Sequence, residues 1–136
     1  MVLNKEHIIK KYDLDIGKVA VYNHYMIAEL NEGIELTLEK TSELIGISEL
    51  HFRNRDFAYI TVRKNSYSVD PIIYRYIRKI ENLKALAIVS LNTFDQHSFN
   101  FEKYFFSKKN MRLFQKTEDA INWIKTIIKD NQIEEN

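Results

Sequence analysis

The spacing of apolar and polar positions predicts strands and helices that alternate along most of the chain. Two apolar runs flank Asn23 and His24 and predict a hairpin, because asparagine tolerates the left-handed backbone of tight turns. Residues 83–91 are apolar almost without alternation, which indicates a strand buried on both faces, as in a parallel sheet covered by helices. Strands are expected at 8–15, 18–22, 25–30, 57–62, 83–91 and 111–114.

Helical spacing of apolar residues predicts two helices before residue 82. Thr37 is the expected N-cap of the first helix, and the pattern leaves its end open between Gly46 and the charged residues 53–56. Asp70 is expected to cap the second helix and Pro71 to open it, because the first turn does not need the N–H that proline lacks. The buried stripe of the second helix is expected to be Ile73, Tyr76, Ile77 and Ile80.

Two more helices are predicted in the second half of the chain. Thr93 and Gln96 form a capping box for the third, and Thr117 is the expected cap of the fourth. The fourth helix is expected to bury Ala120, Ile121, Ile124, Ile127 and Ile128. The order of elements predicts one α/β domain over residues 1–130 and a polar C-terminal tail at 131–136. The sheet is expected to be mostly parallel, with an N-terminal antiparallel hairpin and four helices.

Composition narrows the classes of function. The 136 residues include no cysteine, which excludes disulfides, thiolate catalysis and zinc–thiolate sites. The start resembles no signal peptide, and no apolar run is long enough to span a membrane, so the expected location is the cytoplasm. The net charge of +1 is spread unevenly. Residues 1–49 carry five Lys/Arg against nine Asp/Glu, whereas residues 50–84 carry eight against three.

This charge division has two interpretations. A basic middle suits an acidic partner, a phosphate group or nucleic acid. Alternatively, the acidic and basic parts pack side by side and neutralise each other. Nucleic acid ranks third among the partner classes considered and is not the expected partner.

Several segments resemble the SpoIIAA-like group, which includes STAS domains and is related in fold to the Sec14 lipid-binding class. They resemble more closely a set of small bacterial STAS/SEC14-domain proteins that are common in the flavobacterial lineage. The most specific match is Asn-Ser-Tyr-Ser-Val-Asp-Pro at residues 65–71. The other matching segments are residues 28–33, 57–60, 87–90, 102–106 and 120–123. The resemblance implies a SpoIIAA-like fold and carries no activity with it.

The loop after the strand at 57–62 is the candidate site. In signalling STAS domains a serine at the start of the following helix is a phosphorylation switch, and this chain has Ser66 and Ser68 there without the usual glycine. Phosphorylation, capture of a small anion, and ordinary loop and cap hydrogen bonds all remain open for these side chains. The candidate contact or switch residues are Arg63, Lys64, Asn65, Ser66, Tyr67, Ser68 and Asp70.

No catalytic or metal-binding pattern accompanies the loop. The histidines at 7, 24, 51 and 97 are scattered, and no serine lies in a Gly-x-Ser-x-Gly elbow. We therefore expect no enzymatic activity, no cofactor and no metal. Phe99 and Phe106 point away from the core side of the predicted third helix, which makes them candidates for hydrophobic contact with a partner or within a homodimer.

The favoured hypothesis is a non-enzymatic binding or regulatory module that meets a protein partner through residues 63–71. The alternative is binding of a lipid or another small amphiphile, as the Sec14 relationship implies.

Overall fold

The computed structural model describes residues 7–63, 68–90 and 110–135. Its main feature is a six-stranded sheet with the strand order β1-β2-β3-β5-β7-β8. The first three strands are antiparallel neighbours, whereas the pairs β3–β5, β5–β7 and β7–β8 are parallel. This confirms the predicted mostly parallel sheet with an N-terminal antiparallel hairpin. The strands are β1 (Lys10–Leu14), β2 (Gly17–Val21), β3 (Tyr25–Leu30), β5 (Phe57–Arg63), β7 (Leu83–Ser90) and β8 (Asn110–Phe114).

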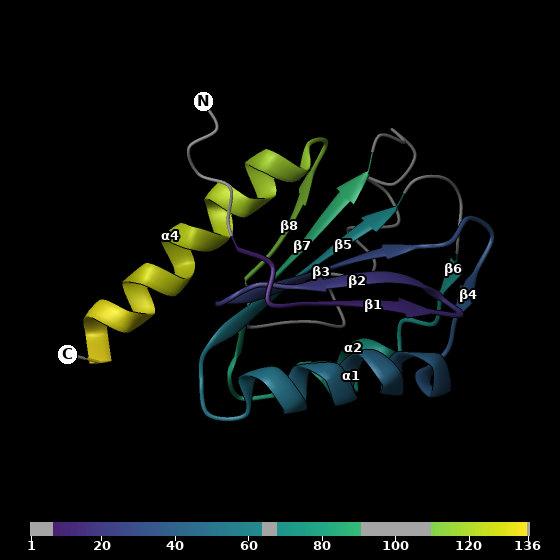
Figure 1. The fold of residues 1–136 in the computed structure, drawn as a ribbon, viewed down its shortest axis with the longest axis horizontal. Helices are drawn as coiled ribbons and strands as arrows, with labels where there is room; N and C mark the ends of the chain where they lie inside the picture. The colour runs from purple at the N-terminus through teal and green to yellow at the C-terminus, as the bar shows by residue number, and fades with distance from the viewer. Residues whose placement is uncertain (1–6, 64–67, 91–109, 136) are drawn as a thin grey trace.

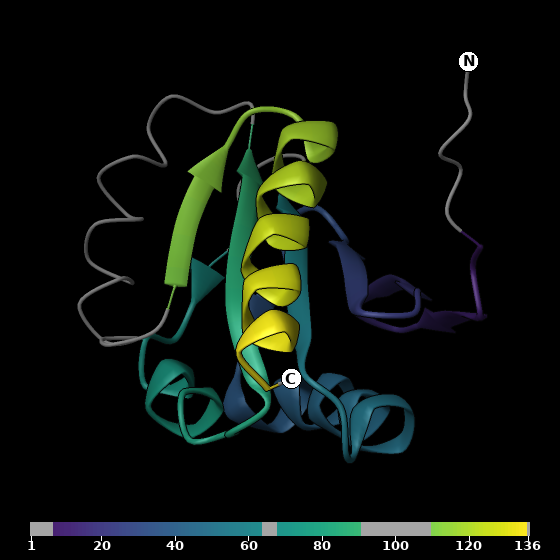
Figure 2. The same ribbon diagram turned by 90° about the vertical axis from the view of Figure 1, so that its left-hand side faces the viewer.

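Helices cover both faces of this sheet. α1 (Leu38–Phe52) and α2 (Ile73–Ile77) lie side by side on one face, and α4 (Thr117–Glu135) lies on the other (Figures 1 and 2). The described residues thus contain three helices rather than the predicted four. The expected helix from Thr93, with Phe99 and Phe106, lies outside the described residues. α4 continues through residues 131–135, which the sequence analysis assigns to a polar tail.

A second, very small sheet stands at the carboxyl end of the parallel strands. It pairs β4 (Glu35–Leu36) with β6 (Ser68–Val69) in parallel, with Glu35 opposite Ser68 and Leu36 opposite Val69. The sequence analysis assigns no strand to either segment. Strands of two residues carry too little alternation to be recognised from a pattern of period two.

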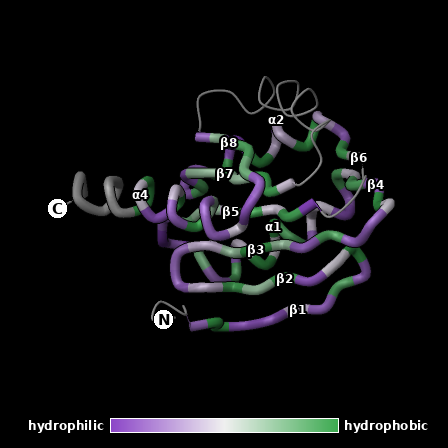
Figure 3. The backbone as a smooth tube through the Cα atoms, turned by 90° about the horizontal axis from the view of Figure 1, so that it is seen from above, coloured by the Kyte–Doolittle hydropathy of each residue, from purple (hydrophilic) through white to green (hydrophobic). Residues whose placement is uncertain are grey.

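The core has two layers, one on each side of the sheet. The layer beneath α4 is lined by alanines of the central strands, and Ala58, Ala85 and Ala87 are all fully buried there. Their small side chains let α4 approach closely, so that Ala120, Ile124 and Ile128 fill the space between. The layer towards α1 and α2 holds larger side chains, including Phe52, Met26, Leu86 and Ile88. The outer strand β1 is largely hydrophilic (Figure 3).

α1 begins where the sequence predicts and ends later than Gly46. The hydroxyl Oγ1 of Thr37 accepts a hydrogen bond from the backbone N–H of Lys40 at 3.3 Å, which is the expected N-cap bond. The helix passes through Gly46 and ends at Phe52. Tertiary contact fixes this end, because the side-chain amide of Asn82 donates to the backbone carbonyl of Phe52 at 2.5 Å.

α2 departs most from the sequence-based prediction. It begins at Ile73 rather than Pro71, and Tyr74 is buried whereas Tyr76 is 49% exposed. The backbone N–H groups of residues 73–75 bond to carbonyls three residues back, and so do those of Lys79 and Ile80. The N–H of Arg78 bonds to the carbonyl of Tyr74, four residues back, as in an α-helix. The buried side of α2 consists of Ile73, Tyr74 and Ile77, and the predicted burial of Tyr76 is wrong.

Candidate functional site

The predicted site lies at the carboxyl end of the parallel strands, where open α/β sheets commonly place binding groups. Arg63 is the last residue of β5 and is 5% exposed. Its register partners on the neighbouring strands are Leu30 and Ser90. Its guanidinium Nη2 donates to the hydroxyl of Tyr74, at 3.4 Å. Arg63 is therefore a buried strand residue, and the prediction that it belongs to the exposed loop is wrong.

The second half of the predicted segment is held in place by β4. Ser68 belongs to β6 and is paired with Glu35. The backbone N–H of Asp70 donates to the carbonyl of Leu36 at 3.2 Å, and its carboxylate Oδ1 accepts from the N–H of Ile72 at 3.1 Å. Asp70 thus caps the turn that leads into α2, three residues before the helix begins at Ile73; the N-cap of the helix is Ile72, so the predicted cap and start are wrong.

The remaining candidates of this segment, Lys64, Asn65, Ser66 and Tyr67, lie outside the described residues. The structure brings the two ends of the segment, Arg63 and Ser68–Asp70, to the same edge of the fold. The candidate site is therefore a loop whose two ends are both anchored in regular structure.

An apolar cavity of about 50 Å³ lies between the sheet and the helices α1 and α2. Its polar lining includes Thr41 and Ser48, whose hydroxyls donate to carbonyls within or just before α1. Oγ1 of Thr61 is buried, with no hydrogen-bond partner among the described residues. A water needs only about 10–15 Å³ of such space, whereas drug-sized ligands occupy pockets of about 300–1,000 Å³. The cavity therefore has room for ordered water and not for a lipid.

A wider groove of about 520 Å³ lies on the opposite face of the sheet, beside the start of α4. Among the residues along it are charged side chains that the strand register places in one row: Asp13 is opposite Lys18, and Lys18 is opposite Glu29. Opposite charges on neighbouring strands attract each other across the sheet. We interpret this groove as the solvated half of a sheet face that α4 only partly covers.

His51 lies in α1 and contacts the neighbouring strand β1. Its Nε2 lies 2.7 Å from the hydroxyl of Tyr12, and the two rings meet edge to face. Burial lowers the pKa of His51, and the nearby positive charges of Arg55 and Lys10 lower it further. The contact joins α1 to β1 and is structural. In the parts of the chain that the structure describes, no three His, Asp or Glu side chains gather as a metal site would require.

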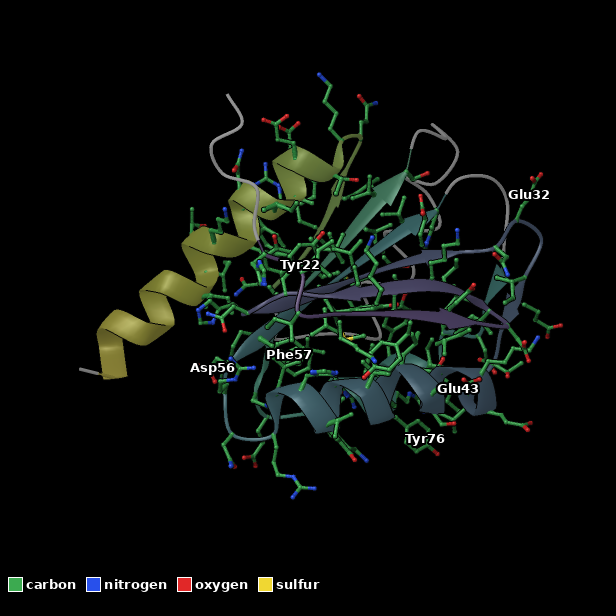
Figure 4. The ribbon with its side chains drawn as sticks, viewed as in Figure 1. Tyr22, Glu32, Glu43, Asp56, Phe57 and Tyr76 are labelled. Carbon is green, nitrogen blue, oxygen red and sulfur yellow. The ribbon has the colours of Figure 1, made fainter. Side chains whose placement is uncertain are left out.

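The outer surface of α1 and α2 is a feature that the sequence analysis missed. Leu50 is 73% exposed, and Ile72 and Tyr76 are 41% and 49% exposed. Figure 4 places Tyr76 and Glu43 on this side of the molecule. In the sequence, the sign of this surface was Leu50 itself, which lies on the side of α1 opposite the buried residues of the helix.

Residues 68–136, which include α2, β7, β8 and α4, match the model of a family of unknown function, DUF8545. The chain belongs to this family. No curated protein matches it. No helix in the described residues is both long and apolar enough to cross a membrane.

The structure is similar to the crystal structure of an uncharacterized DUF3478 protein with a SpoIIAA-like fold from Shewanella loihica PV-4. The match has a TM-score of 0.52 at 13% sequence identity, and it covers 91% of this chain and 98% of the other. At this identity the likeness shows the fold alone. The SpoIIAA-like fold expected from the sequence is confirmed.

Proposed function

We propose that this member of the DUF8545 family is a non-enzymatic binding module of SpoIIAA-like type, which contacts a protein partner through residues 63–71. The observation that carries the proposal is the anchoring of this segment at both ends. Arg63 fixes one end inside the sheet, and the pairing of β6 with β4 fixes the other. Binding segments are commonly held on a rigid scaffold, because fixed ends reduce the entropy that a segment loses on binding.

The surroundings of the segment suit a polar protein contact. Asp70 and Glu35 are both exposed at this edge and carry carboxylates that can accept hydrogen bonds from a partner. Between Arg63 and Asp70 the sequence adds two serines, an asparagine and a tyrosine. A tyrosine on a polar loop offers a large contact area with few rotatable bonds, which favours its use at interfaces.

Affinity purification from the native cell tests the proposal directly. The baits are the wild-type chain and a Ser66→Ala/Tyr67→Ala/Ser68→Ala variant, compared by quantitative mass spectrometry. The matched control is Glu81→Gln, an exposed change just before β7, at the opposite end of the parallel strands. We expect the loop variant to lose a partner that the control retains, and isothermal titration with the purified partner to show at least a tenfold loss of affinity. Identical partner sets for all three baits would show that the segment is not the contact.

Binding of a lipid or small amphiphile is the weaker candidate. Its structural support is the apolar cavity beneath the sheet, whose volume of about 50 Å³ is far below that of a lipid chain site. Native mass spectrometry of protein purified from its own cells decides between the two. A stoichiometric lipid adduct would replace the proposal of protein binding.

A further inference from the structure

Large apolar side chains are exposed at four places in the described residues: Ile9, Leu50, Ile72 and Tyr76. Three of these four lie on α1 or at α2, the two helices that share one face of the sheet. Single exposed apolar residues need no explanation, but several on one face of a small domain indicate a contact surface. We call the outer sides of α1 and α2 the helical face.

The α1 half of the helical face is acidic, and a glycine without a side chain lies in its middle, at Gly46. Glu39, Glu43, Gly46 and Leu50 follow one another at helical spacing, on the side opposite the buried residues of the helix. A Cβ at Gly46 would meet nothing within 4 Å, so the backbone of α1 is accessible there. Glycine in a helix interior costs about 1 kcal/mol relative to alanine. No contact among the described residues requires this glycine, whereas a closely packed partner would.

The α2 half is basic and aromatic. Ile72, Arg75, Tyr76 and Lys79 are all exposed and recur at spacings of three and four residues. The ammonium of Lys79 lies 5.9 Å from the ring centroid of Tyr76, within the range of a cation–π contact. This half therefore offers positive charge on and around an exposed aromatic ring.

Three cations border the acidic half. The ammonium of Lys40 donates to the backbone carbonyl of Glu35 at 3.1 Å, beside the start of the helix. Arg53 follows the last residue of α1, and the guanidinium of Arg55 donates to the side chain of Asn23 and to the carbonyl of His51. On the helix itself Glu39 precedes Lys40, Glu43 and Glu49 follow it, and all three acidic side chains are exposed.

We propose that the helical face binds a second copy of the same chain across a two-fold axis, with α1 of each copy on α2 of the other. The reason is the separation of charge onto two adjacent helices. A two-fold axis brings the same patch of both subunits together, so an acidic half meets a basic half twice. A partner of a single charge would satisfy only one of the two halves and would repel the other.

The size of the face agrees with this assembly. A stable interface of standard size takes about 800 Å² from each partner. This is about a tenth of the 8507 Å² accessible surface of the chain, so one face of the domain is sufficient. Because the attraction is partly between exposed charges, the dimer weakens as the salt concentration rises. The helical face begins at Ile72, directly after the segment at 63–71, and the inference does not depend on the proposed function.

Two charge-reversed variants test the proposal. The first is Glu39→Lys/Glu43→Lys, which makes both halves of the face basic. The second is Arg75→Glu/Lys79→Glu, which makes both halves acidic. The control is Lys11→Glu/Lys116→Glu, an equal change of charge on exposed lysines of β1 and of the turn before α4. Each is compared with the wild-type chain by sedimentation equilibrium over a concentration series, and circular dichroism confirms that each is folded.

We expect a dimer for the wild-type chain and the control, and at least a tenfold weaker dimer for each charge-reversed variant. An equimolar mixture of the two charge-reversed variants is expected to restore a dimer, because the basic α1 of one then meets the acidic α2 of the other. A monomeric wild-type chain, unchanged dimers in both variants, or a mixture that stays monomeric would each overturn the proposal. The loop variant Ser66→Ala/Tyr67→Ala/Ser68→Ala is expected to dimerise normally, which separates this test from that of the proposed function.

Discussion

The guanidinium of Arg63 donates a hydrogen bond to the hydroxyl of Tyr74, with 3.4 Å between Nη2 and Oη. The contact joins the end of the central strand β5 to the core-facing side of α2. Arg63 and Tyr74 are 5% and 3% exposed, so water does not readily replace either partner. Through this pair, the edge that carries the 63–71 segment is attached to the helix that carries half of the helical face.

Tyr74→Phe removes only the hydroxyl of this pair. We expect the free energy of unfolding to fall by about 1 kcal/mol, because the buried guanidinium loses one acceptor through a long hydrogen bond. Urea denaturation measures the change. Tyr76→Phe is the matched control, since that ring is 49% exposed and its variant is expected to stay within about 0.5 kcal/mol of wild type. Equal effects at both positions would mean that the Arg63–Tyr74 bond contributes nothing.

Asn82 fixes the end of α1 from a distant part of the chain. Its Nδ2 donates to the carbonyls of Phe52 at 2.5 Å and Arg55 at 2.8 Å. Asn82→Ala leaves both carbonyls without this donor, and we expect a loss of about 2 kcal/mol in unfolding free energy, about 1 kcal/mol for each bond. Asn54→Ala, an exposed change in the same turn, is the control. A loss at Asn82 no larger than that at Asn54 would contradict this assignment.

Gly17 is required by the close approach of β2 to β3. A Cβ at this position would lie 2.8 Å from the Cα of Leu30 and would collide with the carbonyl oxygen of Glu29, and φ is +150°. We expect Gly17→Ala to lower the free energy of unfolding by more than about 1 kcal/mol. Gly46→Ala is the contrasting control, because its Cβ meets nothing and alanine favours a helix by about 1 kcal/mol.

Both glycine variants are measured by thermal and urea unfolding at a concentration where sedimentation shows a monomer. This condition keeps any effect of Gly46 on the proposed dimer out of the comparison. A Gly17→Ala variant as stable as wild type would show that β2 and β3 can separate to admit the methyl group.

His51 makes stability depend on pH. Burial and the charges of Arg55 and Lys10 hold its pKa below the ordinary value of 6.5, so the unfolded chain binds a proton more readily than the folded chain does. The free energy of unfolding therefore falls as the pH drops through about 6.5, and this contribution levels off below the folded-state pKa.

Urea titrations across this pH range, on wild type and His51→Gln, isolate the effect from that of the carboxylates. We expect the variant to show a shallower loss of stability towards acid pH. His7→Gln, the same change at an exposed histidine, is the control and is expected to follow the wild-type profile. Parallel profiles for wild type and His51→Gln would remove His51 as the cause.

The strands were the most predictable part of the fold, because their burial leaves a pattern in the sequence. The unbroken apolar run of β7 predicts burial on both faces, and seven of its eight residues, all but Lys84, are buried. The hairpin at Asn23 and the N-cap at Thr37 were also predicted, since both depend on local chemistry. The end of α1 was not predicted, because it depends on Asn82, which lies 30 residues after Phe52 in the sequence.

The sequence described the candidate segment too simply. The sequence shows a polar loop after a buried strand, and it places Arg63 in that loop. The structure assigns Arg63 to β5 and Ser68 to β6, because the strand continues one residue farther and β4 supplies a partner for the other end. Pairing between segments more than 30 residues apart leaves no local periodicity to read.

The sequence by itself determined the alternation of elements, the separation of acidic and basic residues along the chain, and the absence of cysteine chemistry. These depend on residue type and on near neighbours, which are visible in one dimension. Only the tertiary structure decided that α1 and α2 share one face of the sheet, which places an acidic helix beside a basic one. It also decided that Tyr76 is exposed, because the buried side of α2 consists of Ile73, Tyr74 and Ile77 and Tyr76 lies beside it.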